Sequence, residues 1–544
     1  MALLEIDDLT VGIGAAPILR SVSLRLDAGE VLGIVGESGS GKTMTALSIM
    51  QLLPERAVVD GRIALAGEDL LGLSEAEMCD RRGGAIGMVF QEPMSALNPV
   101  KTIGQQVAET VLVHRRVTRR GAEALARDTL DRVGLPAARF PLGRYPHELS
   151  GGQRQRVVIA MAVILKPRLL IADEPTTALD VTTQARILDL LKRLMRDDGV
   201  SLILISHDLA MVAEMADRIA IMKSGEIVES GETVSLLRGM RHPYSRMLSA
   251  ASAYRTRRAG RHRDDQPPPA PILVVDGVSR DYRLPRHSLF ERARVLRAVR
   301  DVGFAIHRGE NVGLVGESGS GKSTLARIVL ALEPPTHGAV VLDGADFLGA
   351  RGRRLFALRR HIQAVFQDPY GSFDPRRRVG GLVAEPLHVD ETKPSAAERR
   401  RRVEAALVAV GLTPTDADKY PHEFSGGERQ RLAIARALIT RPSLIVLDEA
   451  VSALDVSIRA QILDLLRDLA ERFDVSYLFI SHDLTVVRAI TDRVLIMRDG
   501  AIVEQGETEE VFANPRHPYT AALIAATPDL ERTLAARAAA TAAP

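Results

Sequence analysis

The same seven residues, Gly-Glu-Ser-Gly-Ser-Gly-Lys, occur twice in this chain of 544 residues, beginning at Gly36 and again at Gly316. Three other short motifs also occur twice in the same order: Ser-Gly-Gly at Ser150 and Ser425, Ser-His-Asp at Ser206 and Ser481, and His-Pro-Tyr at His242 and His517. The first pair is offset by 280 residues and the other three by 275. A nearly constant offset of this length indicates a duplicated domain rather than a short solenoid repeat.

A segment rich in Arg, Asp and Pro separates the two halves. It covers residues 255–271 and ends in Gln-Pro-Pro-Pro-Ala-Pro. Because such a segment cannot bury apolar surface, we interpret it as a semi-rigid linker. The predicted domains are therefore residues 1–254 and 272–532. The alanine-rich end, residues 533–544, is expected to be a frayed tail.

Within each half, short apolar runs alternate with helical patterns. In the first half, residues 31–35, 169–172 and 202–205 are candidate buried strands. Apolar residues recur at helical spacing between the last two of these runs, from Ile187 to Met195. Strands that alternate with helices predict an α/β fold in which helices cover both faces of a parallel sheet.

Each repeated heptapeptide is followed by a hydroxyl residue and so fits the pattern G-x-x-x-x-G-K-[ST]. Each also lies between an apolar strand and a helical pattern, which is the context that a phosphate-binding loop requires. Glycines let the backbone curl around phosphate oxygens, and the helix N-terminus adds partial positive charge. The lysine reaches the β- and γ-phosphates of ATP, and the hydroxyl residue is a ligand of Mg²⁺. The candidate residues are Gly36, Ser38, Gly39, Ser40, Gly41, Lys42 and Thr43, and Gly316, Ser318, Gly319, Ser320, Gly321, Lys322 and Ser323.

An apolar strand ends in two adjacent carboxylates in each half, Asp173-Glu174 and Asp448-Glu449. An acid after a strand is also common as a helix N-cap. Downstream of a phosphate loop, however, the aspartate is expected to hold Mg²⁺, and the glutamate to polarise the attacking water.

The composition excludes several other classes of protein. One cysteine, Cys79, rules out an internal disulfide, a cysteine zinc site and a four-cysteine iron–sulfur cluster, and we expect it to be a buried thiol. The net charge of +2 predicts no general attraction to nucleic acid. The sequence contains no run of about 18 apolar residues, so we predict no membrane-spanning helix. No targeting segment is recognised at the start.

The order of these motifs resembles the ATP-binding cassette (ABC) family. The family's signature is matched by Leu-Ser-Gly-Gly-Gln at 149–153 and, with one change, by Phe-Ser-Gly-Gly-Glu at 424–428. The resemblance implies two tandem cassettes, each with a RecA-like core, a helical subdomain and an antiparallel β subdomain. It also implies that the signature of one half binds the γ-phosphate held by the other half. The residues concerned are Ser150, Gly151 and Gly152 for the Lys322 site, and Ser425, Gly426 and Gly427 for the Lys42 site.

Other roles follow from the resemblance alone. Gln91 and Gln367 are expected to sense Mg²⁺, His207 and His482 to contact the γ-phosphate, and Tyr282 to stack on adenine. Thr324 is expected beside the phosphates. The implied Mg²⁺ ligands are Thr43, Gln91, Asp173, Ser323, Gln367 and Asp448.

The two halves also depart from the family pattern in different ways. Ile13 lies near the place expected for an adenine-stacking aromatic in the first half, and Met44 replaces the hydroxyl residue found at Thr324. Glu428 replaces the usual signature glutamine. All three changes affect the site built on Lys42, so we expect this site to bind ATP more weakly.

Within the family, the chain resembles the branch that imports peptides and nickel. The segments 90–99 and 366–375 and the late His-Pro-Tyr motifs are typical of it. The implied protein is the ATPase motor of an importer of peptides or similar small solutes, at the cytoplasmic face of the inner membrane. Its implied partners are two integral-membrane permeases and an extracytoplasmic solute-binding protein, with no nucleic acid.

The proline-bounded segments that follow Gln91 and Gln367 are expected to present apolar side chains to the permeases. These side chains are Met94, Leu97, Tyr370 and Phe373. The alternative is that each segment is simply a loop packed inside its domain.

A soluble tandem ABC ATPase that acts on ribosomes is the alternative function. Such proteins usually have a longer, charged helical linker, and they carry Asn-His-Leu-Asp where this chain has Thr-Ala-Leu-Asp at 177–180. The transported solute cannot be read from this chain, because selectivity lies in the permeases and the binding protein.

Overall fold

The computed structural model describes residues 2–252, 270–283 and 295–542, apart from residues 178, 369–370, 391 and 453. The chain forms two compact units, one of residues 1–253, 455–457 and 528–544, the other of residues 254–454 and 458–527. The linker expected at 255–271 lies almost wholly outside the described residues. Within the described ranges, no helix is long and apolar enough to cross a membrane.

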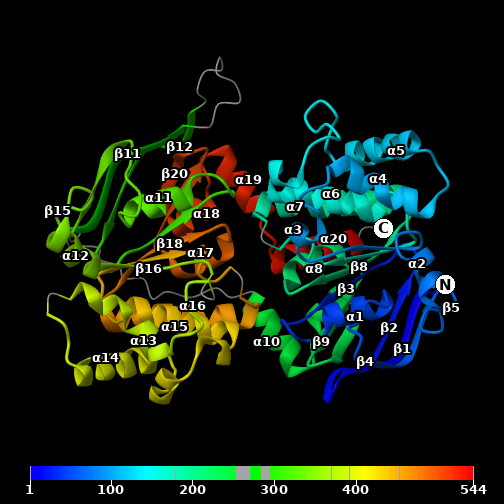
Figure 1. Cartoon of the computed structure of the whole chain (residues 1–544), viewed down its shortest axis with the longest axis horizontal. Coiled ribbons are helices and arrows are strands. Elements are labelled where there is room, and N and C mark those ends of the chain that lie inside the picture. Colours follow the sequence, from blue (N-terminus) through cyan, green and yellow to red (C-terminus); the bar gives the residue numbers. More distant parts are fainter. Residues whose placement is uncertain are drawn as a thin grey trace. The chain divides into compact units, whose positions relative to one another are not determined.

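The first unit contains two sheets (Figure 1). The smaller is antiparallel and has the strand order β2 (Ala16–Asp27), β1 (Ala2–Ile13), β4 (Ala57–Leu65) and β5 (Glu68–Asp69). The larger has the order β10 (Glu226–Glu232), β9 (Arg218–Lys223), β3 (Val31–Val35), β8 (Ser201–Ser206), β7 (Leu169–Asp173) and β6 (Ile86–Val89). All of its neighbouring strands are parallel except β10, which pairs with β9 in the antiparallel sense.

The helices of the first unit cover the larger sheet and form a separate layer. They are α1 (Lys42–Ile49), α2 (Glu75–Arg81), α3 (Pro93–Ala96), α4 (Ile103–His114), α5 (Arg119–Arg132), α6 (Gly151–Val163), α7 (Val181–Asp198), α8 (Leu209–Met215), α9 (Thr233–Arg238), α10 (Pro243–Ser252) and α20 (Leu530–Ala542). Helices α4, α5 and α6 pack against one another and make up the expected helical subdomain (Figure 1).

The second unit repeats both sheets. The antiparallel sheet has the order β12 (Val295–His307), β11 (Pro271–Arg283), β14 (His337–Leu342) and β15 (Ala345–Asp346). The larger sheet has the order β16 (Ile362–Val365), β17 (Leu444–Asp448), β18 (Ser476–Ser481), β13 (Asn311–Val315), β19 (Arg493–Arg498) and β20 (Ala501–Glu507). The helices are α11 (Lys322–Val329), α12 (Gly352–His361), α13 (Val379–Val383), α14 (Ala396–Ala409), α15 (Gly426–Leu438), α16 (Val456–Phe473), α17 (Leu484–Ile490), α18 (Thr508–Ala513) and α19 (Pro518–Ala526). The predicted α/β fold, duplicated along the chain, is therefore confirmed.

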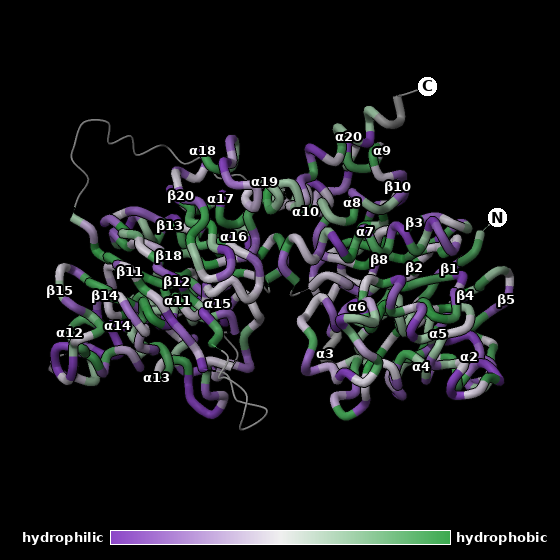
Figure 2. Tube along the Cα trace, turned by 90° about the horizontal axis from the view of Figure 1, so that it is seen from above, coloured by the Kyte–Doolittle hydropathy of each residue, from purple (hydrophilic) through white to green (hydrophobic). Residues whose placement is uncertain are grey.

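Two hydrophobic cores lie on opposite faces of the larger sheet in each unit. In β8, Leu202 and Leu204 belong to one core, and Ile203 and Ile205 belong to the other. The central strands therefore have continuous apolar sequences, because helices or a second sheet cover both of their faces. Figure 2 shows hydrophobic segments along these strands and hydrophilic segments on outer helices such as α12.

Two sequence expectations are wrong. The alanine-rich end does not fray at residues 530–542; it forms helix α20, which packs against α8 and α9, with Leu530 buried in the first unit's core. Alanine favours a helix, and Leu530 and Leu534 provide the apolar contact that holds it. Cys79 is exposed rather than buried, because it lies on the outer face of the short helix α2.

Candidate functional site

The phosphate loop of each unit wraps tightly between its strand and its helix. A Cβ atom added to Gly36 would lie 2.2 Å from the carbonyl oxygen of Met222, and one added to Gly316 would lie 2.2 Å from that of Met497. Gly41, the N-cap of α1, has a φ of 107°, which only glycine adopts without strain. Glycine is therefore required at both ends of the loop.

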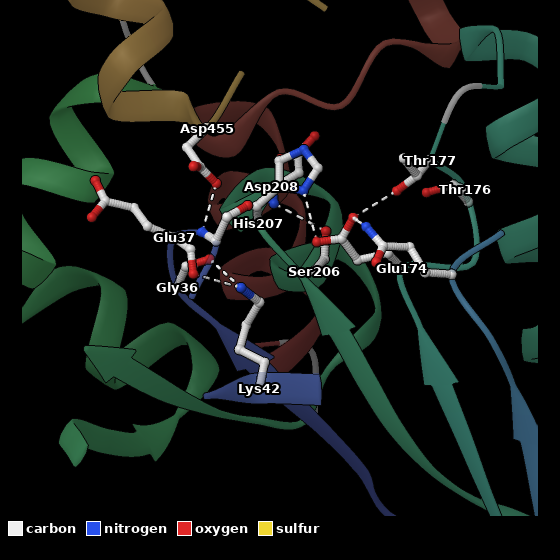
Figure 3. A network of polar contacts seen from close by, with 12 residues as sticks. Gly36, Glu37, Lys42, Glu174, Thr176, Thr177, Ser206, His207, Asp208 and Asp455 are labelled. Atoms are coloured by element: carbon white, nitrogen blue, oxygen red, sulfur yellow. Dashed lines mark hydrogen bonds and ion pairs between the residues drawn. The ribbon is translucent and has the colours of Figure 1, made fainter. Parts of the chain in front are cut away.

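The lysine of each loop is folded back over the loop itself. Lys42 is 5% exposed, and its ammonium group donates hydrogen bonds of 2.8 Å to the carbonyl oxygens of Gly36 and Glu37 (Figure 3). Lys322 makes the equivalent bonds, of 2.7 and 2.8 Å. Burial lowers the pKa of Lys42. The positive charge therefore lies inside the loop, where it can bind phosphate.

The strand-end aspartates have an unusual environment. Asp173 is buried, and one of its carboxylate oxygens, Oδ1, has no hydrogen-bond partner among the described residues. Oδ1 of Asp448 is in the same state. Burial raises the pKa of Asp173 to about 6, although the Thr43 hydroxyl donates a hydrogen bond that opposes this shift. A buried carboxylate oxygen that lacks a donor is suited to a cation or to a water bound by one.

Glu174 lies at the centre of a polar network (Figure 3). Its carboxylate accepts hydrogen bonds from Gln91 Nε2 (2.9 Å) and Thr177 Oγ1 (2.8 Å), and it lies 3.2 Å from His207 Nδ1. Its backbone has a φ of 46°, a left-handed conformation that is uncommon for glutamate, and its N–H is held by the carbonyl of Ile205. Burial alone would raise the pKa of Glu174, but the bonds from His207 and Thr177 lower it to about 2.

Glu449 has a similar but not identical environment. Gln367 Nε2 donates to it at 2.9 Å, and His482 Nδ1 lies 3.2 Å away. Ser452, however, donates to the backbone oxygen of Glu449, whereas Thr177 donates to the carboxylate of Glu174. Burial opposes ionisation of Glu449, yet the contact with His482 lowers its pKa. Both glutamates are therefore held as anions by residues that are distant in the sequence.

The two signature motifs begin helices α6 and α15. Ser150 and Ser425 are their N-caps: the Ser150 N–H donates to the side chain of Gln153 at 3.0 Å, and Ser425 forms a reciprocal capping box with the residue three positions later. In α15 this residue is Glu428, which accepts from both the N–H and the hydroxyl of Ser425, and these bonds lower its pKa. The departure at Glu428 is thus compatible with the local helix start. The binding of γ-phosphate by these motifs stays a prediction.

The residue expected to stack on adenine lies at the end of β11. The Tyr282 hydroxyl donates to Glu333 at 2.7 Å, and the Arg280 guanidinium lies 4.8 Å from the ring centre. Ile13 occupies the equivalent position in β1. Ile13 lies nine residues after Leu4, which pairs with Leu65, and Tyr282 lies nine residues after Leu273, which pairs with Leu342. Met44 is half-buried against the neighbouring apolar core, and Thr324 is also half-buried. The first site thus lacks an aromatic ring where the second has one.

Two parts of the site were not anticipated correctly. Leu97 and Phe373 are buried in the cores of their units, so they are not the exposed apolar side chains that the sequence suggested. The side chains of Met94 and Tyr370 lie outside the described residues. The role of the His-Pro-Tyr tyrosines was missed: in both units, the tyrosine hydroxyl contacts the phosphate loop. The recurrence of this motif was the only signal in the sequence.

In each unit a phosphate loop, a buried lysine, a strand-end aspartate and a fixed glutamate lie on one RecA-like core, an arrangement that defines an ATP-hydrolysing protein with two cassettes. The sequence model of the family described as ABC transporter matches residues 19–177 and 299–452. A second model, described as oligopeptide/dipeptide transporter, C-terminal region, matches residues 503–543. The chain belongs to the ABC transporter family and hydrolyses ATP, as the motifs predicted.

Curated relatives extend over almost the whole chain. The glutathione import ATP-binding protein GsiA of Escherichia coli (strain K12) is 46% identical over 541 residues, covering 94% of this chain and 87% of that protein. The protein of the same name from Salmonella choleraesuis (strain SC-B67) is 46% identical over 543 residues, with coverage of 94% and 86%. A solved dimeric structure of the ATP-binding cassette MJ0796 bound to ADP and Pi is 30% identical, covers 43% of this chain and 98% of that chain, and has a TM-score of 0.39.

Proposed function

We propose that this chain is the motor of an importer that takes up glutathione or short peptides. The observation that carries the proposal is the 46% identity with glutathione import ATP-binding proteins across 94% of the chain. The match of residues 503–543 to the oligopeptide/dipeptide transporter model supports the same class of solute. The ribosome-acting alternative has no comparable support.

Mg²⁺ is proposed to accompany ATP at both sites. The orphaned Oδ1 atoms of Asp173 and Asp448 fit this ion, which prefers oxygen ligands and usually takes few from the protein. The further ligands proposed are Thr43 and Ser323, with Gln91 and Gln367 acting directly or through water. When bound, the ion neutralises negative charge on the phosphates.

The residues of each cassette have distinct proposed roles in hydrolysis. The first N–H groups of α1 and α11 are suited to phosphate oxygens, because a helix N-terminus carries partial positive charge. The ammonium groups of Lys42 and Lys322 add positive charge beside them. Glu174 and Glu449 accept a hydrogen bond from the attacking water and orient it. Both glutamates are held by a glutamine and a histidine of their own unit, so they are proposed to keep the water in a fixed orientation.

Coupling to transport is proposed to follow the family scheme. Ser150–Gly152 complete the site built on Lys322, and Ser425–Gly427 complete the site built on Lys42. ATP binding draws the cassettes together and hydrolysis releases them. Two integral-membrane permeases at the cytoplasmic face of the inner membrane respond to this cycle, and an extracytoplasmic binding protein delivers the solute. Because the cassettes are fused, each is always present at high effective concentration for the other.

Reconstitution tests the proposal. The chain is purified with the permeases encoded beside it, placed in lipid vesicles and supplied with the neighbouring binding protein. We expect ATP hydrolysis and vesicle uptake to rise with glutathione or a tripeptide, and not with a free amino acid. The proposal is wrong if none of the peptides stimulates hydrolysis. Binding of the chain to ribosomes, without association with the permeases, would favour the alternative.

A further inference from the structure

The tyrosine of each His-Pro-Tyr motif reaches the phosphate loop of its own unit. The backbone N–H of Glu37 donates to the Tyr244 hydroxyl at 3.0 Å, and the N–H of Glu317 donates to the Tyr519 hydroxyl at 3.0 Å. Both tyrosines are almost fully buried, at 4% and 6% exposed. Residues about 200 positions apart thus make the same contact twice, which argues against a chance arrangement of one loop.

The rest of the motif fixes each tyrosine in place. In the first unit, Glu229 on β10 accepts from the N–H groups of Arg241 (2.8 Å) and His242 (3.3 Å). The His242 ring then accepts, through Nδ1, from the N–H of Tyr244 at 3.2 Å. The tyrosine, which is the second residue of α10, is therefore preceded by a segment whose backbone N–H groups are held by side chains.

The second unit reproduces this anchoring almost unchanged. Glu504 on β20 accepts from the N–H groups of Arg516 (2.7 Å) and His517 (3.0 Å), and His517 Nδ1 accepts from the N–H of Tyr519 (3.1 Å). A cation also lies over each ring: Lys223 is 5.0 Å from the centre of the Tyr244 ring, and Arg498 is 4.9 Å from that of Tyr519. In both units the histidine of the motif thus holds the backbone of the tyrosine whose hydroxyl contacts the loop.

The peptide unit at the start of the loop is held from two directions. In the peptide unit that joins Gly36 to Glu37, the carbonyl oxygen of Gly36 accepts from the Lys42 ammonium, while the N–H of Glu37 donates to the Tyr244 hydroxyl. Figure 3 shows the contacts of the Lys42 ammonium with Gly36 and Glu37. The backbone is tightly packed at this point, because a Cβ atom added to Gly36 would lie 2.2 Å from the carbonyl oxygen of Met222. The Tyr244 hydroxyl accepts a hydrogen bond from the Glu37 N–H and so satisfies this donor.

We propose that Tyr244 and Tyr519 are positioning residues that hold the two phosphate loops in the shape that binds ATP. The His-Pro-Tyr segments thereby set the affinity for ATP from outside the phosphate-binding residues themselves. The tyrosines do not touch the reacting atoms, so they act on binding and not on the chemical step. The effect belongs to ATP binding alone and does not depend on which solute the importer carries.

The test compares two buried tyrosines of the second unit. Tyr519→Phe removes the hydroxyl that contacts the loop and keeps the ring. Tyr477→Phe is the matched control, because its hydroxyl is also buried but donates to the carbonyl of Leu466 at 2.8 Å. Tyr477 lies opposite Asn311, at the end of β13 away from the loop. Each change is made in the full chain carrying Lys42→Ala, so that the second site dominates the binding of labelled Mg-ATP.

Loss of the hydrogen bond between the half-buried N–H of Glu317 and the buried tyrosine hydroxyl is expected to weaken ATP binding about 5- to 30-fold in Tyr519→Phe. Tyr477→Phe should leave the affinity within about twofold of the parent chain, whatever its melting temperature. Tyr244→Phe in a Lys322→Ala chain should reproduce the loss at the first site. The proposal is overturned if Tyr519→Phe binds ATP as tightly as its parent, or if both variants lose affinity equally.

Steady-state ATP hydrolysis provides a second measurement, because a purely structural role of the tyrosines would not change the KM for ATP. In the otherwise unaltered chain, the double variant Tyr244→Phe, Tyr519→Phe should raise the KM for ATP by a similar factor. Its kcat at saturating ATP should stay within about twofold, because the contacts of Glu174 and Glu449 are unchanged. A lower kcat with an unchanged KM would place the tyrosines in the chemical step and contradict the proposal.

Discussion

Replacing Glu174 and Glu449 together by glutamine separates ATP binding from hydrolysis. The Glu174 carboxylate accepts from Gln91 and Thr177 through one oxygen and lies beside His207 through the other. A glutamine amide has the same shape and can keep these contacts. Its oxygen accepts from Gln91 and Thr177, and its NH₂ group lies beside His207 Nδ1, a ring atom that accepts a hydrogen bond in one of the two tautomers. We therefore expect the double variant to fold and bind ATP normally.

Hydrolysis should nevertheless be almost lost. An amide cannot accept a hydrogen bond from the attacking water as strongly as a carboxylate held ionised by its neighbours. Removing a group of this kind typically lowers the rate about 10²- to 10⁴-fold. This range corresponds to about 3–5 kcal/mol of activation free energy. Because Glu174 and Glu449 are both replaced, hydrolysis at an unaltered second site cannot hide the loss.

The assay measures phosphate release at saturating Mg-ATP and, on the same preparation, equilibrium binding of labelled ATP. Glu123→Gln is the control, since Glu123 is a partly exposed residue of α5 that pairs with Arg119. It should leave both quantities unchanged. Turnover within tenfold of the unaltered chain would exclude both glutamates from catalysis. Loss of ATP binding would refute the argument that the amide preserves the site.

Three further outcomes follow. Lys322→Ala should leave a chain that binds ATP several-fold more weakly than Lys42→Ala does, because the first site lacks an aromatic ring like Tyr282, which we propose stacks on adenine with a gain of about 0.5–1.5 kcal/mol; equal affinities would contradict this. Gly36→Ala should weaken ATP binding at the first site at least tenfold, because its Cβ would lie 2.2 Å from a carbonyl oxygen, whereas Gly143→Ala, with open space around it, should not. Burial opposes ionisation of Asp198, but its ion pairs lower its pKa, so its stabilisation is present above about pH 4 and is lost below. Asp198→Asn should therefore lower the melting temperature by about 2–4 °C at pH 7, with a deficit that shrinks from pH 5 to pH 3; a constant deficit would refute the ion-pair origin.

The duplication, the α/β fold and the phosphate loops could be predicted because their signals are contiguous. A strand of apolar residues, a glycine-rich turn and a helix start depend on neighbours within about ten residues. The strand-end pair Asp173-Glu174 is recognisable for the same reason. The predicted strand at 169–172 became β7 with one residue added, and the one at 31–35 became β3 unchanged.

Properties that depend on side chains meeting across the fold could not be predicted in this way. Nothing local shows that Leu97 and Phe373 turn into the cores, or that Cys79 faces outward. The same is true of the C-terminal helix, whose alanines do not specify a partner. Burial is decided by what packs against a segment, and packing partners come from distant parts of the chain.

The amino-acid sequence by itself determined which chemical groups this ATPase has, and in what order. Only the tertiary structure decided how those groups are held and charged. Gln91 and His207 meet at Glu174 because β6, β7 and β8 are parallel neighbours whose ends lie at one edge of the sheet. Tyr244 meets Glu37 because α10 folds back onto the phosphate loop. Such contacts join residues from 33 to 207 positions apart. No pattern in the sequence predicts a hydrogen bond between residues that far apart.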